Sequence, residues 1–454
     1  MHVLVIGAGT GGLCLAQKLK RAGISVAVYE RDRTRTDGLF GFRVGISPDG
    51  SRALRACLPP DLHDTFRATA AIRPRYLNML SEHRRELLSI DNAGMGTIED
   101  EHSVSRMTLR QLLLTGIEDV VHFDKKFTRY ERHDDGTVTA WFADGTSATG
   151  DVLVGADGTG SPVRRQYLPH ARLRETGLFG ITGKLPLTEQ TAKLLTPKIH
   201  RGVSMVFGPR GDSAIIHVME FNWNERGQVK HGIGGNDAEL LTRWPGLQFD
   251  NTRDYIMLGF GSHRRYLPEN FMSLDGPALH RILRERTASW HRDLHRLFEL
   301  VDTTTCFPLN IRTTETVAPW ETTNVTLIGD AIHTMTPGLG VGANTALRDA
   351  RVLGENLVAA RDSGTPALDA IRGYEERMHG YAWDAVRKSL ERFDGESAVY
   401  KPGIGRLALA GMRTGMRLVN HLPPVKRRMA AAQGAERGHN RAGEGEAGQV
   451  REHG

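Results

Sequence analysis

The first thirty residues alternate between short apolar runs and one glycine-rich turn. Residues 3–6 are all apolar, a run typical of a parallel strand that is buried on both faces. The glycines follow at once, and an apolar helical pattern then ends at Gly23. Residues 25–29 form a second apolar run. This succession of strand, turn, helix and strand predicts the start of a parallel α/β sheet.

Further along the chain the apolar pattern changes twice. Alternating runs within residues 75–91 predict a hairpin, and two Asp-Gly dipeptides mark further hairpin turns. From about residue 169 to 315 the pattern is strand-rich with one long helix over residues 278–300, which predicts an inserted second domain. A strand over residues 325–328 and a helix over residues 344–359 then return to the α/β pattern.

The first motif that carries chemistry is the glycine-rich turn after the first strand. Gly7 permits a tight turn, Gly9 lets a pyrophosphate approach the backbone, and Gly12 allows close packing of helix on strand. The N-terminus of the following helix favours phosphate groups. The predicted phosphate contacts are Gly7, Gly9, Thr10, Gly11 and Gly12.

An acidic residue completes this first motif. Glu30 ends the second strand, eighteen residues after Gly12, and its carboxylate can accept hydrogen bonds from both hydroxyls of an adenosine ribose. Arg31 beside it is a further candidate contact. The spacing predicts a dinucleotide site, and a glycine-rich turn without a ligand is the alternative. At this point NAD and FAD are both compatible with the pattern.

Two later motifs also follow apolar strands. Residues 151–158 end in Asp157-Gly158, an acid–glycine turn that in isolation is as well explained by an ordinary turn. Residues 327–333 deliver Asp330 to the carboxyl end of a strand, where ligands bind in open α/β sheets. A carboxylate there can accept hydrogen bonds from a sugar-alcohol chain. NAD has no ribityl chain, so the three motifs together favour FAD.

The ordered set of motifs resembles the single-component (class A) flavoprotein monooxygenases, the group of para-hydroxybenzoate hydroxylase and the tetracycline-inactivating hydroxylases. The resemblance covers about residues 1–395. Its carriers are GAGTGG with Glu30, SRMTLRQLL, GADGTGSPVR and GDAIHTMTPGLGVGAN. The ordered set is highly specific, although each member alone is not. Ile332 departs from the small residue usual in the third motif.

The resemblance implies roles for several residues. Arg106 of SRMTLRQLL would contact FAD phosphate or ribose, Asp157 would organise the FAD and nicotinamide sites, and Asp330 would bind the ribityl chain. Arg43 lies near the family's mobile flavin loop and is a looser candidate for FAD contact. The residues expected near the flavin ring are Pro337, Gly340, Val341, Gly342, Ala343 and Asn344.

The resemblance also implies an activity. NADPH or NADH would reduce non-covalently bound FAD, and the reduced flavin would react with O2 to a C4a-hydroperoxide that oxygenates a small substrate, by default an aromatic or polycyclic natural product. Hydroxylation, epoxidation and Baeyer–Villiger insertion are not separated, and no catalytic base is identified, although His217 and His333 are available. The alternatives are an FAD-dependent reductase or desaturase, a halogenase, whose WxWxIP signature is absent, and a non-enzymatic binding module.

Composition narrows this picture only slightly. The 454 residues are 39% hydrophobic and 25% charged, typical of a globular protein, and the net charge of +6 is not gathered into one patch, so no nucleic-acid partner is expected. The three cysteines, Cys14, Cys57 and Cys306, are too scattered for a disulfide framework or metal site and fit a reducing cytoplasm. No apolar stretch is long enough to predict a membrane span, and oligomeric state is left open.

We therefore expect an α/β fold in which a Rossmann-like FAD-binding domain of the para-hydroxybenzoate hydroxylase type holds an inserted, sheet-rich substrate domain and is followed by C-terminal helices. The hairpin of residues 75–91 could belong to the substrate domain. The expected units are FAD-binding residues 1–168, substrate-binding residues 169–315, FAD-binding residues 316–365, C-terminal helices 366–422 and a disordered tail 423–454.

Overall fold

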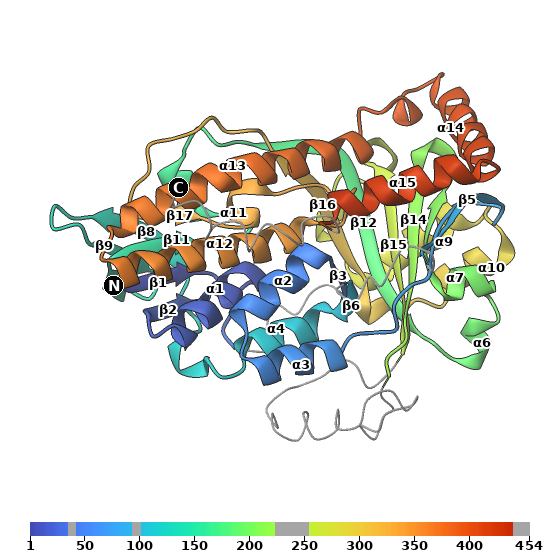
Figure 1. Cartoon of the computed structure of the whole chain (residues 1–454). Coiled ribbons are helices and arrows are strands. Elements are labelled where there is room, and N and C mark those ends of the chain that lie inside the picture. The colour runs from blue at the N-terminus through green and yellow to red at the C-terminus, as the bar shows by residue number, and fades with distance from the viewer. Residues whose placement is uncertain (35–41, 93–100, 223–253, 439–454) are drawn as a thin grey trace.

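The computed structural model of the protein describes residues 1–34, 42–92, 101–222 and 254–438. Two main sheets occupy the two halves of the molecule (Figure 1). The long helices α12 (Gly342–Ser363) and α13 (Ala367–Arg392) extend along the first half, and α13 continues toward the second. The three cysteines are free and buried. Among the described residues, no helix combines the length and the apolar character needed to cross a membrane.

The first sheet is parallel throughout, in the order β17-β11-β1-β2-β7. Its central strand is fully buried at residues 3–5, as expected for a parallel strand covered on both faces. Helix α1 (Thr10–Arg21) packs against α12. The strands are β1 (His2–Ile6), β2 (Ser25–Tyr29), β7 (Val121–His122), β11 (Val152–Gly155) and β17 (Val325–Leu327).

Two small sheets accompany the first one. One is an antiparallel three-stranded sheet whose consecutive strands are connected by the two Asp-Gly turns and whose β10 contacts β1. The second small sheet is the ribbon β3–β6, and its strand β6 leads directly into α4 (Arg106–Leu114). These strands are β8 (Phe127–Arg132), β9 (Val138–Phe142), β10 (Ser147–Gly150), β3 (Arg43–Ile46) and β6 (His102–Ser105).

The second sheet has seven strands in the order β16-β12-β15-β14-β13-β4-β5. All neighbours are antiparallel except β4 and β13, and the pairing of β4 with β13 places the hairpin of residues 75–91 in this sheet. Its strands are β4 (Tyr76–Ser81), β5 (Glu86–Asp91), β12 (Leu173–Pro186), β13 (Gly202–Phe207), β14 (Ser213–Met219), β15 (Tyr255–His263) and β16 (Phe307–Thr314).

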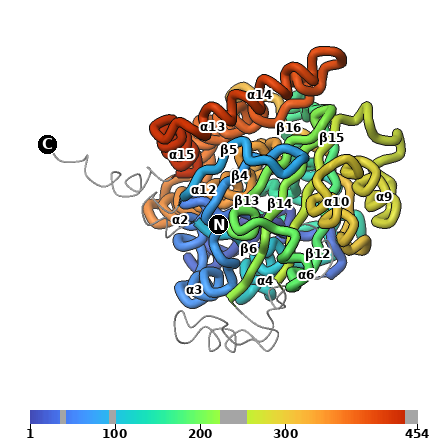
Figure 2. Tube along the Cα trace, turned by 90° about the vertical axis from the view of Figure 1, so that its right-hand side faces the viewer, coloured from blue at the N-terminus to red at the C-terminus, as the bar shows by residue number. Residues whose placement is uncertain are grey.

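The two faces of this second sheet differ in burial. Alternate residues of β14 point to opposite faces. Ala214, Ile216 and Val218 pack with α9 (Gly276–Thr287) and α10 (Arg292–Glu299) in one apolar core. Figure 2 shows these two helices next to the strands of this sheet. On the opposite face Met219 packs with Phe42, which directly precedes β3. We call this opposite face of the seven-stranded sheet the inner face.

The expected single helix over residues 278–300 is wrong, because α9 and α10 are separate helices. Trp290 lies between them, buried, with its ring centroid 5.7 Å from that of Phe298 and 6.3 Å from that of Phe260. The His291 side chain then caps α10 by accepting a hydrogen bond from the Asp293 N–H at 3.2 Å. Packing of an aromatic side chain therefore overrides the continuous helical pattern.

The expectation of a disordered tail from residue 423 is also wrong for its first part, because Pro423–Glu436 form helix α15. Ala430 is buried against Leu88 and Ile90 of β5, and Glu436 accepts a hydrogen bond from Arg392 at 2.6 Å. These contacts offset the ordering entropy of a segment with few large apolar groups. Residues 439–454 lie outside the described part of the chain, and the other domain boundaries stay predictions.

The remaining helices complete the two halves. They are α2 (Pro48–Cys57), α3 (Pro60–Ala68), α4 (Arg106–Leu114), α5 (Pro162–Tyr167), α6 (Glu189–Ala192), α7 (Pro197–His200), α11 (Asp330–His333) and α14 (Gly405–Asn420).

Candidate cofactor and substrate site

The glycine turn after β1 has the geometry that its sequence predicts. Gly7 has φ +106°, and a Cβ there would lie 2.5 Å from the Ala156 carbonyl oxygen. A Cβ on Gly12 would lie 2.2 Å from the Gly7 carbonyl oxygen, so only glycine lets α1 pack this closely on β1. Gly9, in contrast, is exposed, and its nearest neighbour would lie 3.8 Å from a Cβ. The turn thus leaves its backbone accessible at Gly9, just before Thr10 begins α1.

Glu30 closes this turn from the end of β2. Its buried carboxylate accepts hydrogen bonds from the Ala8 N–H at 2.6 Å and the Asp32 N–H at 3.0 Å. A carboxylate has about four lone-pair sites, so two sites remain for ribose hydroxyls. Arg31 is exposed beside it.

The second and third motifs are joined by Arg164, the last residue of the GADGTGSPVR segment. Its guanidinium donates to the Ala331 carbonyl oxygen at 2.7 Å and to the Thr159 carbonyl oxygen at 2.9 Å. Asp157 accepts a hydrogen bond from the Val163 N–H at 3.2 Å, and desolvation raises the pKa of its carboxyl group. The acid–glycine turn is therefore part of the same site.

Asp330 begins α11 at the carboxyl end of the parallel sheet, directly after Gly329, whose φ is +62°. Its side chain is exposed, and no hydrogen bond from the described residues reaches its carboxylate. Desolvation by the surrounding protein nevertheless raises its pKa, while the positive charges of His333 and Arg106 oppose this shift. The carboxylate is accessible and within electrostatic reach of Arg106, as a ribityl-binding residue requires.

Asn344 is the residue for which the structure changes the expected role most. Its side-chain oxygen accepts a hydrogen bond from the Ser47 N–H at 2.8 Å, and its amide donates to the Gly45 carbonyl oxygen at 2.8 Å. The buried side chain therefore joins α12 to the segment after β3. A contact of Asn344 with a flavin ring would have to come from its backbone.

The loop before α12 carries the other residues expected near the flavin. Pro337 and Gly340 are exposed, Gly340 with φ +66°, and Val341 is buried. Gly342 and Ala343 are partly buried in the first turn of the 22-residue helix α12. Their unpaired N–H groups supply the positive end of a long helix dipole.

His333 has a structural environment. Its Nε2 lies 2.6 Å from the Asp349 Oδ2 atom, and both side chains are fully buried. Asp349 also accepts hydrogen bonds from the Gly329 N–H at 2.8 Å and the Tyr381 hydroxyl at 2.6 Å. Burial opposes protonation of His333, but the Asp349 carboxylate outweighs burial and raises the pKa of His333. This network holds the turn that presents Asp330, and His333 is not available as a base.

His217 on β14 is also fully buried, but none of the described residues forms a hydrogen bond with either of its ring nitrogens. It shares the inner face of the second sheet with Met219. Burial, and then the positive charge of Arg43, lower the pKa of His217 well below its usual range. Arg43 itself donates hydrogen bonds from its Nε and guanidinium to Ser103 at 3.3 and 3.0 Å, and desolvation lowers its pKa to about 10.

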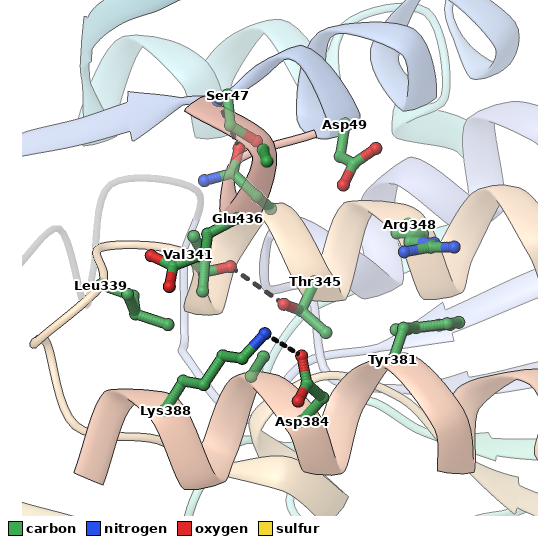
Figure 3. A pocket seen from close by; sticks show the side chains of 13 residues that line it. Ser47, Asp49, Leu339, Val341, Thr345, Arg348, Tyr381, Asp384, Lys388 and Glu436 are labelled. Atoms are coloured by element: carbon green, nitrogen blue, oxygen red, sulfur yellow. Dashed lines mark hydrogen bonds and ion pairs between the residues drawn. The ribbon is translucent and has the colours of Figure 1, made fainter. Parts of the chain in front are cut away.

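A separate polar cavity of about 200 Å³ lies between α12 and α13 (Figure 3). Arg348 stacks 4.0 Å from the Tyr381 ring centroid, and Asp384 pairs with Lys388 at 2.7 Å. The lining includes Val341 and Asn344 but neither the glycine turn nor Asp330. This cavity therefore does not unite the predicted cofactor residues.

The fold and the three turns define a dinucleotide-binding α/β protein with a second sheet beside its ligand edge. A family model described as "FAD binding domain" matches residues 1–232 and 275–389. A structure from Photorhabdus luminescens, determined as a candidate FAD-containing monooxygenase, is 32% identical with a TM-score of 0.73, over 86% of this chain and 97% of that one. The chain belongs to this family of FAD-dependent monooxygenases, which confirms the family and fold class expected from the sequence.

Two further relatives show the same fold or sequence pattern. HpxO of Klebsiella pneumoniae, crystallised with FAD and uric acid, has a TM-score of 0.73 at 24% identity, over 96% of both chains. A dual O-methyltransferase/FAD-dependent monooxygenase of Cercospora beticola is 34% identical over 402 residues, which are 83% of this chain and 44% of that protein. The chain thus spans less than half the length of the first curated relatives it matches.

Proposed function

We propose that this chain is an FAD-dependent monooxygenase that uses NADPH or NADH and O2 to hydroxylate a small organic substrate of the aromatic or polycyclic natural-product type. Bound FAD would supply the redox and oxygen chemistry. The observation that most supports this proposal is the accessible Asp330 carboxylate, which lacks a protein hydrogen-bond partner among the described residues and interacts electrostatically with Arg106. A site of this kind fits a ribityl chain next to a phosphate.

The residues of the chain would divide the work between the two sheets. The glycine turn and Glu30 would bind the adenosine half of FAD, Asp330 the ribityl chain, and the first turn of α12 the electron-rich end of the flavin ring. The inner face of the second sheet would hold the substrate. Its apolar residues Val203, Met205, Ile215 and Met257 are only partly buried. An apolar surface that is still accessible suits a flat organic molecule and helps to exclude water.

The decisive experiment follows the oxygen atom. Turnover under 18O2 with NADPH or NADH should consume O2 and leave one 18O atom in the product, as measured by mass spectrometry. If turnover proceeds without 18O incorporation, or equally well without O2, the chain is instead a reductase or desaturase.

The cofactor has its own test. The purified protein should be yellow, and heat should release FAD, because the glycine turn and Glu30 require an adenosine half. Release of FMN would contradict the proposal. The free, buried cysteines support a reducing compartment, and we propose the cytoplasm as the location.

A further inference from the structure

His217 stands apart from the other buried histidines in the described part of the chain. Both of its ring nitrogens lack a hydrogen-bond partner among the described residues, whereas the buried His333 retains Asp349 and the partly buried His379 retains Trp383. Native proteins satisfy nearly all buried polar groups, because each unsatisfied one costs about 1–3 kcal/mol. An imidazole with two nitrogens that no described residue satisfies is therefore a candidate for binding a ligand.

The strands around His217 offer it no hydrogen bond. In the sheet register it lies opposite Val203 on β13 and Met257 on β15, and on its own strand the same face carries Ile215 and Met219. Directly opposite residues in antiparallel pairs are close neighbours. The immediate neighbours of the imidazole on this face are therefore apolar. The nearest charged group in the same cross-strand row is Lys184 on β12, which lies beyond Met257 with its ammonium group over the Phe42 and Tyr255 rings at 5.4 and 5.1 Å.

The inner face at this point is turned toward the FAD-binding half of the protein. Met219 and Tyr255 pack with Phe42, and the Tyr255 hydroxyl donates to the Phe42 carbonyl oxygen at 2.8 Å. Arg43 follows on β3 and interacts electrostatically with His217. Its register partner Ser105 directly precedes Arg106, the arginine that interacts with Asp330. The ribbon β3–β6 therefore connects His217 on one side with the predicted flavin site on the other.

We propose that His217 is a substrate-binding residue whose imidazole accepts a hydrogen bond from an aromatic hydroxyl group of the substrate. This inference rests on the proposed function and specifies its substrate as a phenol. A neutral imidazole has one acceptor nitrogen, which a hydroxyl donor satisfies. Because burial keeps His217 neutral, the acceptor is present at neutral pH.

The test compares two probes that differ by one hydroxyl group. Equilibrium dialysis of the FAD-containing protein against 2-naphthol or naphthalene measures their binding without turnover, so its result is independent of whether oxygen is inserted. The wild type should bind 2-naphthol at least about tenfold more tightly than naphthalene, the value of one satisfied hydrogen bond. H217L should bind both probes equally.

Two matched variants identify the group responsible. H217Q keeps a carbonyl acceptor and should retain a preference for 2-naphthol. H379L makes the same side-chain change in α13, at a histidine that also has one ring nitrogen without a partner, and should keep the full preference.

A stability measurement separates a functional histidine from a structural one. Because His217 gains no hydrogen bond from the fold, H217L should unfold at the same or a higher denaturant concentration than the wild type. Equal binding of both probes by the wild type, an undiminished preference in H217L, or a clearly lower unfolding midpoint of H217L would each overturn the inference.

Discussion

The two halves of the molecule treat a buried histidine in opposite ways. Beside the parallel sheet, His333 is bonded to Asp349, which also binds a backbone N–H and a tyrosine hydroxyl. On the inner face of the seven-stranded sheet, His217 is equally buried and has no partner. The first histidine helps to hold the turn that presents Asp330. The second forms no hydrogen bond with any of the described residues.

The same contrast extends to other polar groups. Glu30 and Asn344 are bonded to backbone groups of their own half, so they define its shape. The Asp330 carboxylate and the His217 imidazole form no hydrogen bond with the described residues. Arg43 of the ribbon β3–β6 interacts electrostatically with His217, and Arg106, which directly follows the ribbon, interacts with Asp330. Glu30 and Asn344 therefore stabilise the frame, whereas Asp330 and His217 are the two groups that we propose bind ligands.

The largest expected effect on stability comes from breaking the hydrogen-bond network around Asp349. D349A removes the partner of His333, the Gly329 N–H and the Tyr381 hydroxyl, and should lower the free energy of unfolding by about 3–5 kcal/mol. Denaturant titration measures this loss. D384A on α13, whose carboxylate forms only partly exposed ion pairs, is the control and should cost no more than about 1 kcal/mol. A similar small cost for D349A would remove the contrast between the two halves.

The second prediction concerns the unsatisfied group of the first half. D330A should weaken FAD binding about ten- to a hundredfold, roughly 1.5–3 kcal/mol, because one charge-assisted hydrogen bond is lost. Fluorescence titration of the FAD-free protein measures the affinity. The unfolding midpoint of the FAD-free protein should not fall, since the Asp330 carboxylate accepts no hydrogen bond from the described residues, and the bond from Thr334 to the Asp330 backbone carbonyl is kept. Unchanged FAD affinity would show that Asp330 is misassigned.

The third prediction concerns α15, which contacts β5 of the seven-stranded sheet and Arg392 of α13. Truncation after Met429 removes Ala430 from its contact with β5 and Glu436 from Arg392, and should lower the free energy of unfolding by about 1–3 kcal/mol. R392A, which removes only the ion pair, should cost at most about 1 kcal/mol. Thermal and chemical denaturation measure the unfolding midpoints of both chains. Equal midpoints for the truncated and the full chain would mean that α15 does not stabilise the core.

The smallest expected effect is in the pH dependence of stability. Folding keeps His217 neutral, so its unfolded form binds a proton that the folded form does not, and stability falls as the pH drops below about 6.5. Between pH 7.5 and 5.5 the wild type should lose about 1 kcal/mol more than H217L. Denaturant unfolding at both pH values checks this difference, and parallel curves for the two proteins would contradict it.

His333 should show the opposite sign. Its pKa is raised in the folded state, so its contribution is complete below about 6.5 and is lost as the pH rises through the folded pKa. The two histidines therefore change the stability with opposite signs, His217 below about pH 6.5 and His333 above it.

The sequence alone determined the parallel half and its turns. Gly7, Gly12 and Glu30 could be interpreted because their roles depend on local backbone geometry, which a strand–turn–helix pattern specifies. The family and its α/β fold followed from the order of these local motifs.

The tertiary structure decided the rest, because it depends on contacts between distant segments. The sequence could not show that Asn344 binds the segment after β3, that α15 packs on β5, or that Trp290 interrupts a helix. It left His217 and His333 as two equivalent candidates. Only the sheet register and the position of Asp349 distinguish them, since a histidine's role depends on whether another part of the chain supplies its hydrogen bonds.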